Sequence, residues 1–344
     1  MKPIRMMVLS LTGGCNLACR YCYASGQERA VMSWEVAQRA IALAAASGER
    51  FVLQLSGGEP LLAFPLLQKI AAQVREQQIP ARVQLQTNGT LITDEVADFL
   101  RTAHFAIGVS LDGRPAENDA QRQLPDGHGA AAAAVAGIKR LAQRGIGIGL
   151  TCVVTAENVA QLPGIVEMAY YLGNVRRIGF DLLRGQGRGG NLRAASAAEV
   201  TQAMAAVQER AAALRRLTGR AIQFTQVEQA GHIRQTPHSG FAHCYAMNGE
   251  GAHVDATGRI YVCSSFVGDE RFYIGNVFTG IDEERQQETA DYIMRSMEFC
   301  RQCEDFSRCG GACFARWAGS GEAGPYAPEC ALKRAAAAAA EETG

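Results

Sequence analysis

Strand-like and helix-like segments alternate through the first half of this 344-residue chain, and this alternation limits the fold more than any other feature. Because parallel strands need long crossover connections, which are usually helices, the pattern predicts a parallel α/β sheet. With about six such units, we expect a partial (β/α)6 barrel of the TIM type rather than a closed eight-stranded barrel. Apolar and β-branched runs typical of strands lie at residues 5–11, 51–55, 82–86, 105–110, 146–154 and 175–182. Helix-like stretches lie at residues 33–46, 64–78, 94–101, 130–144, 159–172 and 197–217, with Ser33 and Thr93 as N-caps.

Three cysteines, Cys15, Cys19 and Cys22, follow the first predicted strand in the spacing C-x3-C-x2-C. Three thiolates so close together can hold one metal cluster, but they leave it one protein ligand short of the four in a closed site. This suggests an iron kept open for a substrate or cofactor. A zinc site completed by a distant residue, or unpaired buried cysteines, are alternatives that the spacing leaves open. The loop also sits where parallel sheets bind ligands, at the carboxyl end of a strand.

Polar or glycine-rich motifs follow the next three predicted strands as well. They are SGGEP at residues 56–60, QTNG at 86–89 and SLDG at 110–113, with Arg122 in the polar stretch beyond. Adjacent glycines let the backbone approach a ligand closely. Each motif alone is typical of an ordinary turn. Four successive strand ends with such loops together indicate a site for a polar cofactor.

The segments CNLACRYCYA, SGGEP, QTNGTLI and GVSLDG, in this order on this framework, resemble the radical S-adenosylmethionine (radical SAM) enzymes over about the first 185 residues. The resemblance implies that Cys15, Cys19 and Cys22 hold a [4Fe–4S] cluster, whose open iron binds the amino and carboxylate groups of S-adenosylmethionine. One electron then breaks the sulfonium C–S bond, and a 5′-deoxyadenosyl radical abstracts hydrogen from the substrate. The resemblance also implies cofactor contacts for Tyr21, Gly57, Gly58, Glu59, Ser110, Arg122 and Leu183.

Seven more cysteines lie in the last third of the chain, and this number exceeds what one metal ion needs. A pair of zinc sites is compatible with the count. The spacing resembles that of the SPASM domain, which holds two auxiliary iron–sulfur clusters, so the resemblance implies three [4Fe–4S] clusters in all. One auxiliary cluster is expected on Cys300, Cys303, Cys309 and Cys330, and the other, compatible with an open iron, on Cys244, Cys263 and Cys313. Cys152 lies in an apolar strand-like run and is expected in the core.

These features divide the chain into four parts. We expect a radical SAM barrel core over residues 1–190, a bridging helix and strand over 191–240, a SPASM module over 241–334 and a C-terminal tail over 335–344. The alanine run in the tail is typical of a terminal helix that frays. The segment RGQGRGGNLR, residues 184–193, is more typical of a solvated linker than of a loop that closes over an anionic substrate.

The charge balance does not favour strongly charged partners. Lysine plus arginine and aspartate plus glutamate both number 34, so nothing points to a nucleic acid or a membrane surface. No apolar run is long enough to span a bilayer, and the apolar part of the N-terminus is too short for a signal peptide. We therefore expect a cytoplasmic protein, in which eleven cysteines indicate metal ligation rather than disulfides.

The resemblance implies an enzyme that abstracts hydrogen from a peptide or protein and oxidises or crosslinks it during peptide maturation. The motif order resembles anaerobic sulfatase-maturing enzymes, but Ser264 stands where those carry an aspartate base. Sulfatase-type maturation and tetrapyrrole side-chain modification are alternatives, and a non-catalytic iron–sulfur electron carrier is a different class. Expected partners are a peptide substrate, an electron donor such as flavodoxin or ferredoxin, and a separate leader-binding protein, because the cysteine motif begins at residue 15.

Overall fold

The computed structural model describes residues 2–236, 241–242 and 244–342, and the strands of this part form one sheet. Their order across the sheet is β11-β10-β9-β8-β1-β2-β3-β4-β5-β6-β7. The strands are β1 (Met6–Ser10), β2 (Phe51–Ser56), β3 (Ala81–Thr87), β4 (Ala106–Ser110), β5 (Ile148–Val154), β6 (Val175–Leu182), β7 (Gln223–Phe224), β8 (Gly251–Val254), β9 (Arg259–Tyr261), β10 (Tyr273–Asn276) and β11 (Gly280–Ile281). The α-helices are α1 (Trp34–Ala45), α2 (Phe64–Glu76), α3 (Asp94–Thr102), α4 (Pro115–Gln121), α5 (Ala131–Gln143), α6 (Pro163–Leu172), α7 (Ala197–Thr218), α8 (Thr225–Gln235), α9 (Tyr245–Asn248), α10 (Glu283–Ser296), α11 (Glu298–Arg301), α12 (Phe306–Cys309), α13 (Phe314–Ser320) and α14 (Ala327–Glu342).

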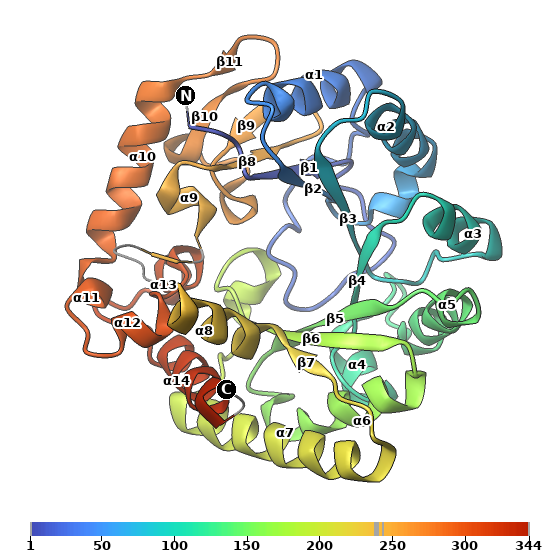
Figure 1. Cartoon of the computed structure of the whole chain (residues 1–344), viewed down its shortest axis with the longest axis vertical. Coiled ribbons are helices and arrows are strands. Elements are labelled where there is room, and N and C mark those ends of the chain that lie inside the picture. The colour runs from blue at the N-terminus through green and yellow to red at the C-terminus, as the bar shows by residue number, and fades with distance from the viewer. Residues whose placement is uncertain (1, 237–240, 243, 343–344) are drawn as a thin grey trace.

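The first six strands and the helices between them form the predicted partial barrel (Figure 1). Strands β1 to β6 pair parallel in chain order, and the connecting helices lie on the outer face of the curved sheet. Ser33 and Thr93 cap α1 and α3 as predicted, because each side chain accepts a hydrogen bond from a backbone N–H in the first turn. Helix α4 was not predicted, since its sequence PAENDAQ has almost no apolar residue to give a periodic pattern.

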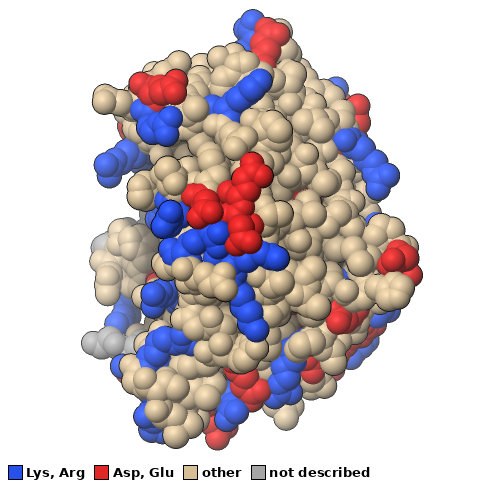
Figure 2. Space-filling view, turned by 90° about the vertical axis from the view of Figure 1, so that its right-hand side faces the viewer, with Lys and Arg blue, Asp and Glu red and all other residues tan. Residues whose placement is uncertain are grey.

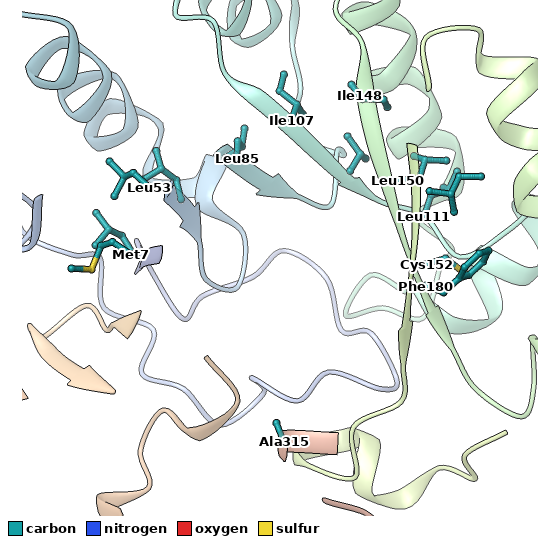
Figure 3. Packing of buried hydrophobic residues seen from close by; sticks show 14 of the residues in the cluster. Met7, Leu53, Leu85, Ile107, Leu111, Ile148, Leu150, Cys152, Phe180 and Ala315 are labelled. Atoms are coloured by element: carbon teal, nitrogen blue, oxygen red, sulfur yellow. The ribbon is translucent and has the colours of Figure 1, made fainter. Parts of the chain in front are cut away.

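Along each barrel strand, successive side chains point alternately to an apolar core and to the barrel interior. In β2 and β5 every second residue is buried against the outer helices, as Leu53, Leu150 and Cys152 show (Figure 3). Cys152 is therefore a core residue, as predicted. The intervening residues, such as Gln54 and Thr151, are only half-buried and line a cavity inside the barrel. The period of two thus places polar groups where a ligand can reach them.

The C-terminal module continues the barrel sheet instead of building a separate one. Strand β8 pairs parallel with β1, joining residues 251–254 to residues 6–9. Strands β9, β10 and β11 then extend the sheet by antiparallel pairing. The domain boundary expected between residues 240 and 241 adjoins residues that the structure does not describe. Strands from before and after this boundary belong to the same sheet.

The alanine run near the C-terminus is packed rather than frayed. Residues 335–342 belong to α14, which lies against α7 and α8. Ala336 and Ala337 are buried and pack with Ala230 of α8. The expectation of a fraying tail is therefore wrong for these residues. Alanine side chains are small enough to let neighbouring helices approach closely, and the packing holds a segment that would fray alone.

Charges of both signs are mixed on the side of the barrel that carries α3 and α5. Figure 2 shows lysines and arginines interspersed with aspartates and glutamates on this face. Arg144 of the loop after α5, for example, lies 2.9 Å from a carboxylate oxygen of both Asp94 and Asp98 in α3. None of the helices described here combines the length and the hydrophobicity needed to cross a bilayer.

The stability of the fold should depend on pH through His253 in β8. This side chain is buried, and within the described residues neither ring nitrogen has a hydrogen-bond partner. Burial lowers the pKa of His253 from 6.5 to about 4. Between these values the unfolded chain binds a proton that the folded chain excludes, so the free energy of unfolding falls as the pH drops. We expect His253→Phe to reduce that fall by about 2–3 kcal/mol, measured by urea unfolding near neutral and acidic pH.

The matched control for this prediction is His232→Phe, because His232 of α8 is exposed. It should leave the pH dependence of the unfolding free energy as it is in the wild-type chain. If His253→Phe also left that dependence unchanged, the buried imidazole would not be its source.

Candidate active site

A cavity of about 490 Å³ opens at the carboxyl ends of the barrel strands, a volume within the range of small-molecule sites. The cysteine loop, residues 12–25, and the inward side chains of the strand ends form its walls. Of the residues predicted from the sequence, Cys15, Cys19, Tyr21, Cys22, Gly57, Gly58, Ser110 and Arg122 line it. Gln86, Thr87 and Asn88 of the QTNG motif line it too, so the structure brings together residues from all four predicted strand-end motifs. Glu59 and Leu183 do not line the cavity.

Glycines hold the SGGEP loop directly against the cysteine loop. Gly58 N–H donates to the Thr12 carbonyl at 2.8 Å, and Glu59 N–H donates to the Gly14 carbonyl at 2.9 Å. A Cβ atom at Gly58 would lie 2.2 Å from the Gly14 carbonyl oxygen, so no larger residue fits without moving the loop. Gly57 adopts φ of 133°, which side-chain-bearing residues rarely do. Backbone contact thus fixes the position of the cysteine loop.

Glu59 joins two strand-end loops beneath the cavity instead of facing it. Its carboxylate accepts hydrogen bonds from the Thr87 hydroxyl at 2.7 Å, Asn88 N–H at 2.8 Å and Leu61 N–H at 3.0 Å. The side chain is fully buried, which raises the pKa of Glu59 to about 6 against the opposing effect of these donors. The expected direct contact between Glu59 and a cofactor is therefore not supported, because no part of the carboxylate reaches the cavity surface.

The thiols of the cysteine loop lie close to one another and to hydrogen-bond donors. Burial, with smaller contributions from the charges of Glu59, Cys19 and Cys22, raises the pKa of Cys15 to about 11. Leu17 N–H donates to the Cys15 sulfur at 3.3 Å and acts to lower this pKa. The Asn88 side-chain amide lies 3.8 Å from the same sulfur. Buried thiols with such donors suit a positively charged metal centre, which keeps them deprotonated. Within the described part of the chain, no three His, Cys, Asp or Glu side chains converge on a single metal ion.

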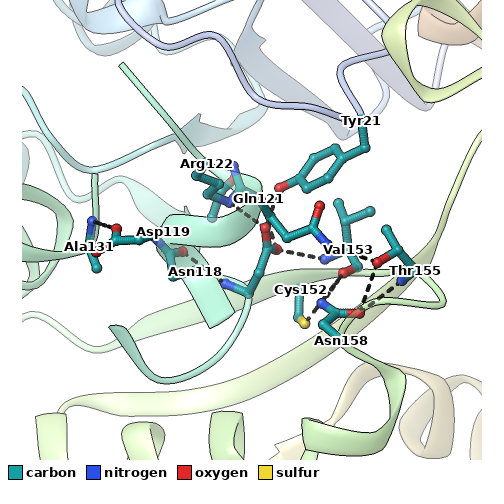
Figure 4. A network of polar contacts seen from close by, with 12 residues as sticks. Tyr21, Asn118, Asp119, Gln121, Arg122, Ala131, Cys152, Val153, Thr155 and Asn158 are labelled. Atoms are coloured by element: carbon teal, nitrogen blue, oxygen red, sulfur yellow. Dashed lines mark hydrogen bonds and ion pairs between the residues drawn. The ribbon is translucent and has the colours of Figure 1, made fainter. Parts of the chain in front are cut away.

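A buried polar network holds the wall of the cavity opposite the glycine loops (Figure 4). The Tyr21 hydroxyl donates to Asp112, and Arg122 pairs with the same carboxylate, with Nε 2.9 Å from Oδ2. Val153 N–H also donates to Asp112, at 2.9 Å. Asp112 was not predicted as a site residue, although an aspartate directly after a strand in SLDG was an available signal. Its partner Tyr21 is 91 residues away in the chain, so only the fold reveals the contact.

The positions of Leu183 and Ser110 refine the predicted cofactor contacts. Leu182, the last residue of β6, lines the cavity where Leu183 was expected. The buried Leu183 instead packs beneath Gly189. Ser110 accepts a hydrogen bond from the Gln86 amide at 3.0 Å, which leaves its own proton free to donate into the cavity.

The C-terminal cysteines influence one another's pKa within two sets. Burial raises the pKa of Cys244 to about 12, and neighbouring charges on Cys313 and Cys263 add to the effect. The second group behaves alike: burial raises the pKa of Cys330 to about 11, with further contributions from its neighbours Cys300 and Cys309. Cys303 belongs to the same group, since its charge also raises the pKa of both Cys300 and Cys309. The role of these thiols as cluster ligands stays a prediction.

Ion pairs connect the cavity to the C-terminal module. Asp181 at the end of β6 lies between Arg184, whose Nη2 is 3.1 Å away, and Arg316 of α13, whose Nε is 3.1 Å away. Although burial opposes it, these two arginines hold the pKa of Asp181 below its ordinary value. Arg184 also donates to the Ser265 hydroxyl at 2.5 Å. An ionised aspartate thus bridges the barrel and the module.

Comparison with known proteins gives a match to the radical SAM superfamily over residues 9–169. The mycofactocin maturase MftC of Mycobacterium ulcerans is 31% identical over 354 residues, covering 96% of this chain and 89% of that protein. A serine-type anaerobic sulfatase-maturating enzyme of Klebsiella aerogenes is 34% identical over 195 residues, covering 54% of this chain and 48% of that protein. The match covers 48% to 63% of the length of this and two other curated relatives.

Two solved structures share the fold over nearly the whole chain. That of anSMEcpe with bound AdoMet has a TM-score of 0.81 at 19% identity, covering 99% of this chain and 98% of that one. That of Streptococcus suis SuiB bound to the precursor peptide SuiA has a TM-score of 0.71 at 16% identity, covering 96% and 75%. These likenesses confirm the predicted fold, a partial barrel followed by a C-terminal module.

The Asp112–Arg122 pair should contribute strongly to stability, because both side chains are buried. We expect Asp112→Asn to lower the free energy of unfolding by about 3–5 kcal/mol, since it leaves the Arg122 charge buried and unpaired. The double variant Asp112→Asn/Arg122→Met should lose less than the sum of the two single variants. Urea unfolding measures both effects. The control is Asp98→Asn, because the Asp98 side chain is 54% exposed and its partner Arg144 keeps Asp94. This change should cost far less, and equal losses at the two pairs would refute the prediction.

Proposed function

The chain belongs to the radical SAM superfamily, and on that premise we propose that it is a maturase that abstracts a hydrogen atom from a peptide or small protein, which it thereby oxidises or crosslinks. One observation carries the proposal: the cysteine side chains of the cysteine loop face the same cavity as Gly57, Gly58, Ser110 and Arg122. An enzyme that positions a cofactor needs this convergence of donors. A simple electron carrier would need the cysteines alone.

We propose that Cys15, Cys19 and Cys22 would hold a [4Fe–4S] cluster with one iron open to S-adenosylmethionine. When bound, this pair supplies a 5′-deoxyadenosyl radical through one-electron cleavage of the sulfonium C–S bond. The chain's own groups suit this task, because Leu17 and Asn88 place donors on the Cys15 sulfur and thereby favour the thiolate.

For S-adenosylmethionine itself we propose contacts with the backbone at Gly57 and Gly58 and with Tyr21, Ser110 and Arg122. Arg122 binds Asp112 through Nε and Nη2, which leaves Nη1 without an acceptor in the described part of the chain and free for a carboxylate. Leu182 takes the place first expected of Leu183. Glu59 then acts on the cofactor only indirectly, by fixing the two loops above it.

In the C-terminal module we propose two auxiliary [4Fe–4S] clusters. One would be held by Cys300, Cys303, Cys309 and Cys330, and the other by Cys244, Cys263 and Cys313. The support is electrostatic, because the charges of the cysteines within each proposed set raise one another's pKa. A pair of zinc sites would use the same thiols but would bind no iron.

A peptide is the substrate class that the relatives support best. SuiB is known with a bound precursor peptide, and the protein that matches 96% of this chain is a maturase. Sulfatase-type maturation has less support, because Ser264 lines the cavity where those enzymes are expected to carry an aspartate base.

We further propose that a flavodoxin or ferredoxin supplies the electron and that a separate protein presents the peptide leader.

Iron content and S-adenosylmethionine cleavage test the proposal on one sample of anaerobically reconstituted protein. Three clusters predict about twelve irons per chain and formation of 5′-deoxyadenosine with dithionite as reductant. Replacing Cys15 and Cys19 by alanine should remove about four irons and abolish the product. Replacing Cys303 and Cys309 should also remove about four irons but leave the cleavage site intact. Cys152→Ala is the matched control, since that cysteine is buried in the core and should not change the iron content.

The outcomes separate the alternatives. About four irons with full product formation would keep the enzyme and reduce the module to zinc or free thiols. Bound iron without any product would contradict the proposal and favour an electron carrier.

Hydrogen abstraction predicts isotope transfer from substrate to cofactor product. With a deuterated synthetic peptide substrate, 5′-deoxyadenosine should acquire deuterium, and mass spectrometry detects it. A peptide that is modified while the 5′-deoxyadenosine stays unlabelled would show that the radical does not act on it directly.

A further inference from the structure

The segment that leaves β6 is packed onto the cysteine loop, and the expectation of a solvated linker is wrong for it. We call residues 184–192 the strap. Arg188 N–H donates to the Cys22 carbonyl at 3.0 Å, and Arg188 Nε donates to the Cys19 carbonyl at 2.8 Å. Gly187 has φ of 54°, and a Cβ there would lie 2.5 Å from the Cys22 carbonyl oxygen. Glycine is needed here because the two backbones touch.

The other end of the strap touches the C-terminal module in the same way. A Cβ at Gly185 would lie 2.1 Å from the carbonyl oxygen of Gly319 in α13. The strap is therefore a fixed wall of the cavity, held by the cysteine loop on one side and by the module on the other. Side chains that it carries have defined positions at the cavity.

The two arginines of the strap have different surroundings. Arg184 is engaged from three sides, by Asp181, by the Ser265 hydroxyl and by the Tyr23 ring, whose centroid lies 4.5 Å from Cζ. Arg188 lines the same cavity but is exposed, and among the described residues no carboxylate contacts it. Only its Nε is used, for the Cys19 carbonyl, so both terminal nitrogens remain free to donate.

A second arginine without a carboxylate partner in the described residues, Arg29, lines the cavity from the segment that follows the cysteine loop. Its backbone is fixed, because the Thr12 hydroxyl donates to the Arg29 carbonyl at 3.0 Å. Its guanidinium has no acceptor in the part of the chain that the structure describes, and the residue is exposed. Arg29 and Arg188 thus both present free, fully charged donor groups to the cavity.

The acids near the cavity do not compensate these two charges. Asp181 is the one aspartate or glutamate among the described lining residues, and Arg184 and Arg316 already neutralise it. Arg122 is paired with Asp112. The remaining acidic groups are the three thiols of the cysteine loop, which a bound cluster would hold as thiolates and whose charge it would share with its irons. A cavity with two uncompensated guanidinium groups attracts anions.

We propose that Arg188 and Arg29 bind a carboxylate of the peptide substrate at the mouth of the cavity. The proposal rests on the proposed function, and it specifies the substrate as a peptide with an acidic side chain or a free C-terminus near the reacting residue. Guanidinium groups bind carboxylates through paired, charge-assisted hydrogen bonds, so such a contact would fix the orientation of the peptide.

Four synthetic tripeptides test the proposal on the reconstituted holoenzyme with S-adenosylmethionine. Two are acetyl-Ala-Tyr-Ala as the free acid and as the amide, and two are the amides of acetyl-Ala-Glu-Ala and acetyl-Ala-Gln-Ala. Binding is measured by saturation-transfer NMR. We expect the acidic member of at least one pair to bind about fivefold more tightly than its neutral twin. The pair that shows the preference identifies the carboxylate as terminal or side-chain.

Arg188→Gln and Arg29→Gln should each reduce that preference to below about twofold. Arg75→Gln is the matched control, because Arg75 lies on the outer helix α2 and pairs only with its neighbour Glu76 in the described structure. Arg188→Gln also removes the bond to the cysteine loop, so its iron content is measured alongside. Arg29→Gln removes no side-chain contact of the described structure and serves as the second test if Arg188→Gln does not fold.

Three results would overturn the proposal. Equal binding within both peptide pairs by the wild-type enzyme is the first, and full preference in both arginine variants is the second. The third is a loss of S-adenosylmethionine affinity in these variants with the peptide preference intact, which would assign the arginines to the cofactor. The 5′-deoxyadenosine assay on the same wild-type sample distinguishes a failure of this inference from a failure of the proposed function. Product without a carboxylate preference removes only this inference, whereas absence of product removes the proposed function.

Discussion

Strand β1 is hydrogen-bonded along both edges, and this double pairing holds the molecule together. A buried strand must satisfy its backbone groups on each side, since an unpaired edge inside a protein is costly. β2 provides one edge and β8 the other, although β8 lies some 240 residues later in the chain. The pairing carries the module to the barrel. For this reason the cysteine loop and the cysteine-rich C-terminal module, which are far apart in the sequence, are attached to the same sheet.

Backbone contact, more than side-chain chemistry, determines the shape of the cavity. The cysteine loop is held by Gly58 on one side and by Gly187 of the strap on the other, and at both places a Cβ would collide with a carbonyl oxygen. Buried acids complete the support, because Glu59 ties the strand-end loops and Asp112 ties Tyr21 to Arg122. Such a frame positions ligand groups before any ligand binds, which is what radical chemistry in a protected cavity requires.

The outcomes at individual residues show which kinds of inference succeed from sequence. The six barrel strands and the caps at Ser33 and Thr93 were predictable, because periodicity and capping act between near neighbours in the chain. Asp112 and the strap were not recognised, since their importance comes from contacts with Tyr21 and Cys22, which are far away in the sequence. The alanines of α14 were misjudged for the same reason: alone they would fray, and α7 and α8 prevent it.

The sequence by itself determined the superfamily and the alternation of strands and helices in the barrel. Cysteine spacing, glycine pairs and the alternation of strand and helix are local patterns, and local patterns can be read without knowing the fold. Only the tertiary structure decided which of those residues meet. It moved Glu59 and Leu183 out of the cavity, left Arg29 and Arg188 free at its mouth, and joined the module to β1. These are results of packing between segments distant in sequence, and no short-range pattern encodes them.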